Sequence, residues 1–245
     1  YRNISTIVEL PGEGVDTLEG FSGTLPDDVE IFDGRRADGG TGAVTVRGNA
    51  LDNTLIGRGR GGYYWNPSAQ AYETDILDGG PGADLMIEGD YARTTFLVDD
   101  PGDRIVVGQG SASENFVKAS ATFELPPGIG TFTLIGSAPI GGIGNAESNT
   151  LDASQNPAAN VLEGRGGADR YILGAGDSLL ETPDAATDEV TLRFAGPPAG
   201  GMNELHAGDP RWANVEVIRL GAQAGRTRLV GDDRGNWLVA NDSGG

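Results

Sequence analysis

Residues 79–87 read GGPGADLMI, and this stretch decides the fold. It follows the nine-residue pattern G-G-x-G-x-D-x-U-x, in which U is a large apolar residue. Such a unit is typical of a turn that can bind Ca²⁺ and then runs into a short strand. Weaker copies of the unit recur at residues 39–47, 48–56, 144–152, 164–172 and 231–239. A unit repeated in this way predicts a solenoid.

Short apolar segments between the glycines predict the secondary structure. Segments such as TLI at 54–56 and RYIL at 170–173 are too short for helices and are bounded by glycine, so they are expected to be strands. Two units would form one coil, with parallel strands stacked about 4.8 Å apart. The apolar residue at position 8 would point inward. The expected inner ladder consists of Leu55, Met86, Leu151, Leu162, Tyr171 and Leu238. The predicted fold class is an all-β parallel solenoid with irregular loop insertions.

Composition limits the classes of function. The 17 basic and 36 acidic residues give a net charge of −19, which argues against nucleic acid and anionic membrane surfaces as partners. This charge favours either simple solubility or a need for divalent cations. There is no cysteine and only one histidine, His206, which excludes disulfides, thiolate sites and multi-histidine metal sites. No apolar run reaches the length of a membrane span.

A longer period contains the nine-residue one. Leu25-Pro26 recurs as Leu125-Pro126, and the triplet at 53–55 recurs at 149–151 and 236–238. We therefore expect one continuous solenoid of three sequence copies. Residues 1–105 form copy 1 with calcium-type turns and an aromatic insertion at 63–74, residues 106–181 form copy 2, and residues 182–245 form a degenerate, truncated copy 3. Both ends of the chain are expected to be cuts within a longer protein.

The glycine-rich turns predict a few calcium sites. Ca²⁺ prefers six to eight oxygen ligands, and glycine allows several backbone carbonyls to point at one spot while an aspartate adds charge. Asparagine at position 6, as at Asn53, Asn149 and Asn236, could ligate without adding charge. Three half-sites are predicted, and they consist of Gly79, Gly80, Gly82 and Asp84; of Gly164, Gly166 and Asp169; and of Gly57, Gly59 and Asp75.

The aromatic insertion at 63–74 is a candidate contact surface. Loops carry function more often than scaffolds do, and aromatic faces suit both sugars and protein partners. The residues concerned are Tyr63, Tyr64, Trp65 and Tyr72. The alternative is that these side chains fold back and cap exposed core.

The segments GNALDNTL, DILDGGPGADLMIEGD and LVDDPGDRIV together resemble bacterial hemolysin-type calcium-binding repeat (RTX) proteins, and more narrowly the large secreted members of that family. The resemblance covers most of the chain. It implies a right-handed parallel β-roll or β-helix, type I secretion, and Ca²⁺ as the cofactor that drives folding outside the cell. The family's ligands carry over to Asp84 and Asp169, and less completely to Asp75.

Three functional hypotheses follow. The favoured one is a secreted or cell-surface structural repeat segment of an adhesin, surface-layer or matrix protein, without catalytic activity. The second is a non-catalytic repeat region of a secreted enzyme or toxin. Catalysis within this segment itself is disfavoured, because neighbouring acids such as Asp99 and Asp100 would point to opposite faces of a strand and make no reactive pair. The third is a module that binds a glycan or a protein through the aromatic insertion. Open solenoid ends also predict end-to-end association of neighbouring copies.

Overall fold

The computed structural model describes residues 12, 14–20, 22–35, 43–59, 65–66, 71–72, 74–90, 93–108, 115–182, 186–193, 203–221, 227–233 and 235–240, with the backbone alone at 65–66, 71–72 and 203–204. The chain divides into two compact units, Tyr1–Ala121 and Thr122–Gly245. The predicted division at 105 and 181 follows sequence copies, and it stays a prediction.

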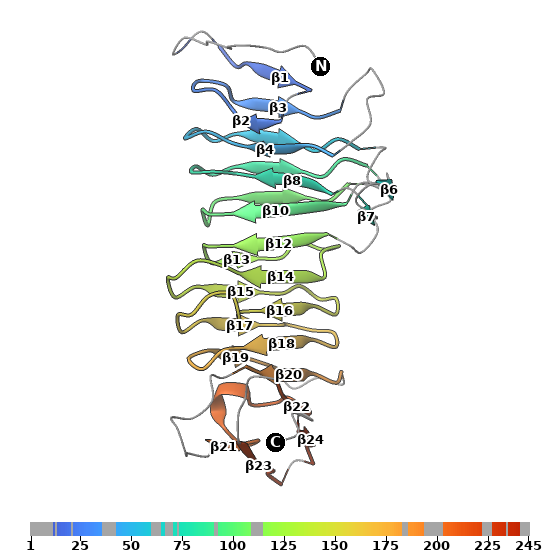
Figure 1. The fold of residues 1–245 in the computed structure, drawn as a ribbon, viewed down its shortest axis with the longest axis vertical. Coiled ribbons are helices and arrows are strands. Elements are labelled where there is room, and N and C mark those ends of the chain that lie inside the picture. The colour runs from blue at the N-terminus through green and yellow to red at the C-terminus, as the bar shows by residue number, and fades with distance from the viewer. Residues whose placement is uncertain are drawn as a thin grey trace. The chain divides into compact units, whose positions relative to one another are not determined.

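Unit 1 consists of short strands that stack in two parallel sheets (Figure 1). Successive strands alternate between the sheets, so that the chain winds through them as a coil. One sheet holds β1 (Thr17–Glu19), β3 (Ile31–Asp33), β5 (Thr54–Ile56), β9 (Leu85–Ile87) and β11 (Arg104–Val106). The other holds β2 (Gly23–Thr24), β4 (Thr45–Arg47), β8 (Asp75–Asp78), β10 (Thr94–Val98) and β12 (Phe116–Ala119).

Unit 2 repeats this architecture with the same parallel pairing. One sheet holds β14 (Thr131–Leu134), β16 (Thr150–Asp152), β18 (Arg170–Leu173), β20 (Glu189–Leu192), β22 (Val217–Leu220) and β24 (Trp237–Val239). The second holds β13 (Phe123–Glu124), β15 (Gly141–Ile143), β17 (Val161–Glu163) and β19 (Ser178–Leu180). A separate parallel pair is formed by β21 (Asn203–His206) and β23 (Thr227–Val230), next to the 3₁₀ helix η1 (Pro210–Trp212). Among the described residues, η1 is the only helical element. The all-β parallel solenoid is therefore confirmed.

The inner ladder forms because every second residue of a strand faces inward. Leu55 lies in register with Met86, and Leu151 with Tyr171, and all four side chains are fully buried. Leu162 is also buried but belongs to the other sheet of unit 2, where it pairs with Leu179. Leu238 continues the row of Ile218 and remains half-buried.

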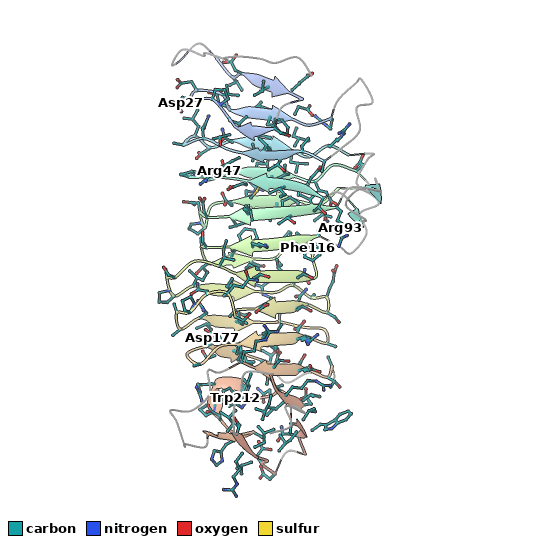
Figure 2. All side chains as sticks on the ribbon, in the orientation of Figure 1. Asp27, Arg47, Arg93, Phe116, Asp177 and Trp212 are labelled. Atoms are coloured by element: carbon teal, nitrogen blue, oxygen red, sulfur yellow. The ribbon has the colours of Figure 1, made fainter. Side chains whose placement is uncertain are left out.

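Several aromatic rings belong to the buried core. Phe32, Phe96, Phe132 and Trp212 are each at most 1% exposed. Outside the core, the guanidinium of Arg93 lies 5.4 Å from the ring centre of Phe116 (Figure 2). The buried core positions the turns in which the acidic residues lie.

Within the predicted insertion, the described residues form a short antiparallel strand pair. Strands β6 (Trp65–Asn66) and β7 (Ala71–Tyr72) pair antiparallel, with Trp65 opposite Tyr72, between β5 and β8 of the parallel stack. Tyr63 and Tyr64 lie outside the described residues. This antiparallel pair thus lies where the insertion was predicted, while its contact role stays a prediction.

Candidate metal centre

The residue that precedes each of the strands β5, β9 and β11 in unit 1 turns its side chain inward. Asp84 accepts the backbone N–H of Asn53 through Oδ1 at 2.7 Å, and Asp103 accepts the N–H of Asp84 at 2.9 Å. All three side chains are at most 5% exposed. Each carboxylate therefore accepts a hydrogen bond from a backbone N–H of the preceding coil. Without a polar side chain at this position, that N–H would be buried and unpaired.

Unit 2 contains the same arrangement. Asp169 accepts the N–H of Asn149 at 2.7 Å, and Asp188 accepts the N–H of Asp169 at 2.8 Å. We call these two rows, Asn53–Asp84–Asp103 and Asn149–Asp169–Asp188, the Asx ladders. The opposite edges use the same contact, because Asp75 accepts from Val44, Asn115 from Thr94 and Asp177 from Asn160. In Figure 2, Asp177 marks this edge in unit 2.

The ladder explains the glycine that opens the units at residues 48, 79, 144 and 164. A Cβ built on Gly79 would lie 2.6 Å from Oδ2 of Asp84, and one on Gly164 would overlap the carboxylate of Asp169. Gly48 and Gly144 have the same relation to the amide groups of Asn53 and Asn149. In these units the Asp or Asn side chain at position 6 thus occupies the space that a Cβ at position 1 would need.

Asparagine at position 6 has a second task that aspartate does not share. The side-chain amide of Asn53 donates to the carbonyl of Val29 at 3.0 Å, and that of Asn149 donates to the carbonyl of Ile129 at 3.2 Å. Asn236 repeats this contact with Val215 at 3.1 Å. A carboxylate could not donate these bonds. The asparagines are therefore structural donors, which the sequence interpretation of them as uncharged ligands did not anticipate.

The structure places all members of the first predicted half-site in one turn. Asp84 lies against Gly79, while Gly80 and Gly82 adopt left-handed φ values of 77° and 132° in the same turn. Oδ2 of Asp84 is buried and has no hydrogen-bond partner among the described residues.

The other two half-sites are assembled differently. Asp75 approaches Gly57 from a distant part of the sequence, because its Oδ2 accepts the N–H of Arg58 at 2.8 Å, and Gly59 has a φ of 60° in that turn. Gly164 borders the Asp169 carboxylate, whereas a Cβ on Gly166 would meet nothing within 4 Å. In each of the three half-sites one glycine (Gly57, Gly79 or Gly164) thus lies against the aspartate, whereas Gly166 makes no such contact.

One group of acidic residues in the described part of the chain has the proximity that a metal ion requires. Asp169, Glu181 and Asp188 each offer a carboxylate oxygen, and these oxygens lie within 4.8 Å of one another. We call these three residues the acidic cluster. Asp169 precedes β18, Glu181 follows β19 and Asp188 precedes β20, so the cluster joins three successive strands. The acidic cluster could therefore hold a metal ion.

The nine-residue pattern pointed to Asp169 but not to Glu181 or Asp188. Glu181 lies outside any nine-residue unit, and it reaches the cluster because the hydroxyl of the buried Tyr171 hydrogen-bonds its carboxylate. A signal for Asp188 was present, since Asp169 and Asp188 have the same sequence separation as Asp84 and Asp103. Such a spacing identifies ladder members only when both turns are known to share an edge.

Burial and neighbouring charges change the acidity of these carboxyls. Burial raises the pKa of Asp84 from an ordinary 3.8 to about 7, and the nearby carboxylate of Asp103 adds to this effect. Burial also raises the pKa of Glu181 from 4.5 to about 7, against the effect of the Tyr171 hydrogen bond and with the help of Asp188. The Tyr171 hydroxyl has a raised pKa as well, because it is buried beside Glu181. Negative charge in these turns is therefore costly without a cation.

The raised pKa values of these carboxyls predict that the stability of the chain in chelator depends on pH. Asp84 and Glu181 bind protons up to about pH 7 when folded but only up to about pH 4 when unfolded. In this window the folded chain holds more protons, so the free energy of unfolding falls as pH rises. We expect the melting temperature, followed by far-UV circular dichroism, to fall by several degrees between pH 5.5 and pH 8. The double variant Asp84→Asn, Glu181→Gln should show a flatter profile, and a rising wild-type profile would contradict this account.

Comparison of the chain with protein-family models, with curated proteins and with solved structures found no match. Within the described residues, no helix has the length and apolar character needed to cross a membrane. The class that fold and site define is thus a parallel β-solenoid with a candidate metal centre at its turns.

Proposed function

We propose that this chain is a structural segment of a secreted or cell-surface protein, a β-solenoid scaffold whose coils are tied together by Ca²⁺. Adhesin, surface-layer and matrix proteins are the classes that such a segment suits. The observation that carries the proposal is the acidic cluster, in which carboxylates next to three successive strands converge within 4.8 Å.

The choice of residue at the ladder positions supports a role for charge. Asn115 and Asn160 accept a backbone N–H just as the aspartates do, at 2.9 and 3.2 Å, and they remain neutral. Hydrogen bonding alone thus does not require Asp169 and Asp188 to be acids. Two buried carboxylates close to Glu181 repel one another unless a cation compensates them.

The donor set fits Ca²⁺. All three residues of the acidic cluster offer oxygen, and calcium takes carboxylate and carbonyl oxygens with flexible geometry, whereas Mg²⁺ demands a near-ideal octahedron and keeps its waters. Bound calcium would supply positive charge between the coils. The protein's own residues hold the carboxylates in place through the backbone N–H groups of Asn149 and Asp169 and the hydroxyl of Tyr171.

Thermal melting tests the proposal. We expect millimolar Ca²⁺ to raise the melting temperature at pH 7.5 above its value in chelator by several degrees, because a ligand at about 100 times its Kd stabilises the folded state by about 2.7 kcal/mol. Glu181→Gln keeps an acceptor for Tyr171 and should lose most of this rise. Glu163→Gln is the matched control, since Glu163 is half-exposed and pairs only at 3.7 Å with Arg165. A melting temperature indifferent to Ca²⁺, or raised equally by Mg²⁺, would contradict a calcium site.

A further inference from the structure

A polar cavity in unit 2 is separate from the candidate metal centre. It has a volume of about 430 Å³, and it is lined by the turns that follow β16 and β18 and by Arg193, the first residue after β20. Asp177, which is labelled in Figure 2, is one of the lining residues. Because β16, β18 and β20 are neighbours in one sheet, three successive coils contribute to the cavity. Its volume lies within the range of about 300–1,000 Å³ that is typical of small-molecule sites.

Two buried polar side chains hold the turns around the cavity in shape. The amide of Asn156 donates to two carbonyls of the preceding coil at 3.1 and 2.9 Å, and its oxygen accepts the N–H of Ala158 at 2.9 Å. The carboxylate of Asp177 accepts the N–H of Asn160 at 2.8 Å and that of Gly174 at 2.7 Å. Asn156 and Asp177 are at most 3% exposed. The cavity is therefore preformed, which lowers the entropic cost of binding a ligand.

Four other polar side chains line the cavity and keep hydrogen-bonding groups that the protein itself does not use. Oδ1 of Asp152 accepts the N–H of Ser154 at 2.8 Å, whereas no described residue donates to its Oδ2. The side chains of Ser154, Gln155 and Arg193 make no hydrogen bond or ion pair with any described residue, and all three residues are exposed. A carboxylate oxygen, a hydroxyl, an amide and a guanidinium are thus available to a ligand.

The guanidinium of Arg193 differs from those of other arginines in unit 2. Several of them pair with a carboxylate within 3.7 Å, namely Arg165, Arg170, Arg211 and Arg219. The side-chain stem of Arg193 lies against Gly221, where a Cβ would come within 2.9 Å of its Cγ, and its backbone N–H donates to Leu173 at 2.8 Å. The protein thus holds the backbone and stem of Arg193 and leaves the cationic group unpaired, although the chain has 36 acidic residues.

The two charged groups lie on either side of the turn that follows β18. Because β16 and β20 flank β18 in the sheet, the backbones of Asp152 and Arg193 are about 10 Å apart, twice the spacing of neighbouring strands. Both side chains line the cavity, and they form no ion pair with one another. One ligand can therefore contact the carboxylate and the guanidinium at the same time.

We propose that this cavity binds a neutral saccharide. Each sugar hydroxyl both donates and accepts a hydrogen bond. The carboxylate of Asp152 accepts, the guanidinium of Arg193 donates, and the Ser154 hydroxyl and Gln155 amide do both, so together they match a row of hydroxyls. Pro157 also lines the cavity and supplies an apolar surface for the C–H groups of the sugar ring. Sites for drug-like ligands are mostly apolar, whereas the polar groups of this lining suit a ligand with many hydroxyls.

Charge favours a neutral saccharide over an acidic one. Arg193 is the only basic residue of the lining, and the carboxylate of Asp152 offsets its charge. The net charge of −19 also repels anionic polysaccharides. No residue of the acidic cluster lines the cavity, and the aromatic insertion belongs to unit 1. The inference therefore goes beyond the proposed function, and its failure would leave the calcium proposal untouched.

Saturation-transfer difference NMR with millimolar lactose, maltose and cellobiose tests the site, with digalacturonate as the acidic probe. We expect at least one neutral disaccharide to bind, and Arg193→Ala to weaken that binding by about tenfold or more. Arg104→Ala is the matched control, because Arg104 is exposed on β11 of unit 1, and it should bind like the wild type. Circular dichroism melting checks that each variant is folded. Binding of digalacturonate alone, binding of no probe, or equal binding by Arg193→Ala would overturn the proposal.

Asp152→Asn tests whether hydroxyl recognition, rather than charge alone, explains the binding. The variant keeps the oxygen that accepts the N–H of Ser154, so the turn is preserved, while the free carboxylate oxygen becomes an amide donor. We expect an unchanged melting temperature and binding of the neutral disaccharide weakened by about tenfold. Asp100→Asn is the matched control, because Asp100 accepts the N–H of Gly102 in the same way at 2.7 Å but lies outside the cavity. Equal binding by the Asp152 and Asp100 variants would contradict the proposed site.

Discussion

Replacing Gly48 with alanine should unfold unit 1 under conditions in which the wild-type chain is folded. A Cβ at this position would overlap the carbonyl oxygen of Gly79 and Oδ1 of Asn53. Both obstacles belong to the ladder, one being backbone and the other held by hydrogen bonds to Val29 and Asn49. The coils would have to separate, and we expect a loss of about 3 kcal/mol or more in the free energy of unfolding.

Urea denaturation followed by far-UV circular dichroism measures this loss, and Gly231→Ala is its control. Gly48 and Gly231 both adopt φ values outside the left-handed region, so alanine causes no backbone strain at either position. Because a Cβ on Gly231 has room, this variant should stay within about 1 kcal/mol of the wild type at low protein concentration. Equal effects of the two substitutions would show that coil stacking does not explain the glycines.

The second large effect is expected from exchanging asparagine and aspartate within the ladders. Asn149→Asp removes the donor to the Ile129 carbonyl and adds a charge beside Asp169, so we expect a loss of about 3 kcal/mol. Asp84→Asn keeps the acceptor for the Asn53 N–H and removes a carboxyl whose pKa is about 7. In chelator at pH 7.5 this variant should gain about 1 kcal/mol or more.

Urea unfolding in chelator measures the free energy of unfolding of both variants, Asn149→Asp and Asp84→Asn. The two residues occupy the same position of the nine-residue unit, so their chemical difference is isolated from their place in the fold. If Asn149 and Asp84 were equivalent calcium ligands without different structural roles, Asn149→Asp would strengthen calcium binding. Its free energy of unfolding in chelator would then fall little. Such a result would contradict the assignment of Asn149 as a structural donor.

The sequence allowed the fold to be predicted because its signals are local. The apolar residue at position 8 and the glycine at position 1 correctly indicated inward side chains such as Leu55 and Met86 and parallel strands between turns. The same motif did not indicate that its aspartate also has a structural role. Asp84 and Asp169 were interpreted as calcium ligands, and in the structure each first of all accepts a backbone N–H of the preceding coil.

The acidic cluster was harder to find because it depends on stacking. Asp169, Glu181 and Asp188 meet only once the chain has wound through β18 to β20, and no nine-residue unit contains more than one of them. Turn lengths between these strands differ, so the coincidence of three carboxylates on one edge does not follow from a fixed period. The buried Tyr171, predicted only as an inner-row residue, also turns out to hold Glu181 in place.

Calcium binding by the folded chain is the central claim, and equilibrium dialysis against buffered Ca²⁺ at pH 7.5 tests it most directly. Metal analysis should find at least one tightly retained Ca²⁺ per wild-type chain. The double variant Glu181→Gln, Asp188→Asn, which keeps every ladder acceptor, should retain at least one ion fewer while circular dichroism shows the same fold. A wild-type chain that retains no calcium, or a double variant that retains as much as the wild type, would contradict the account.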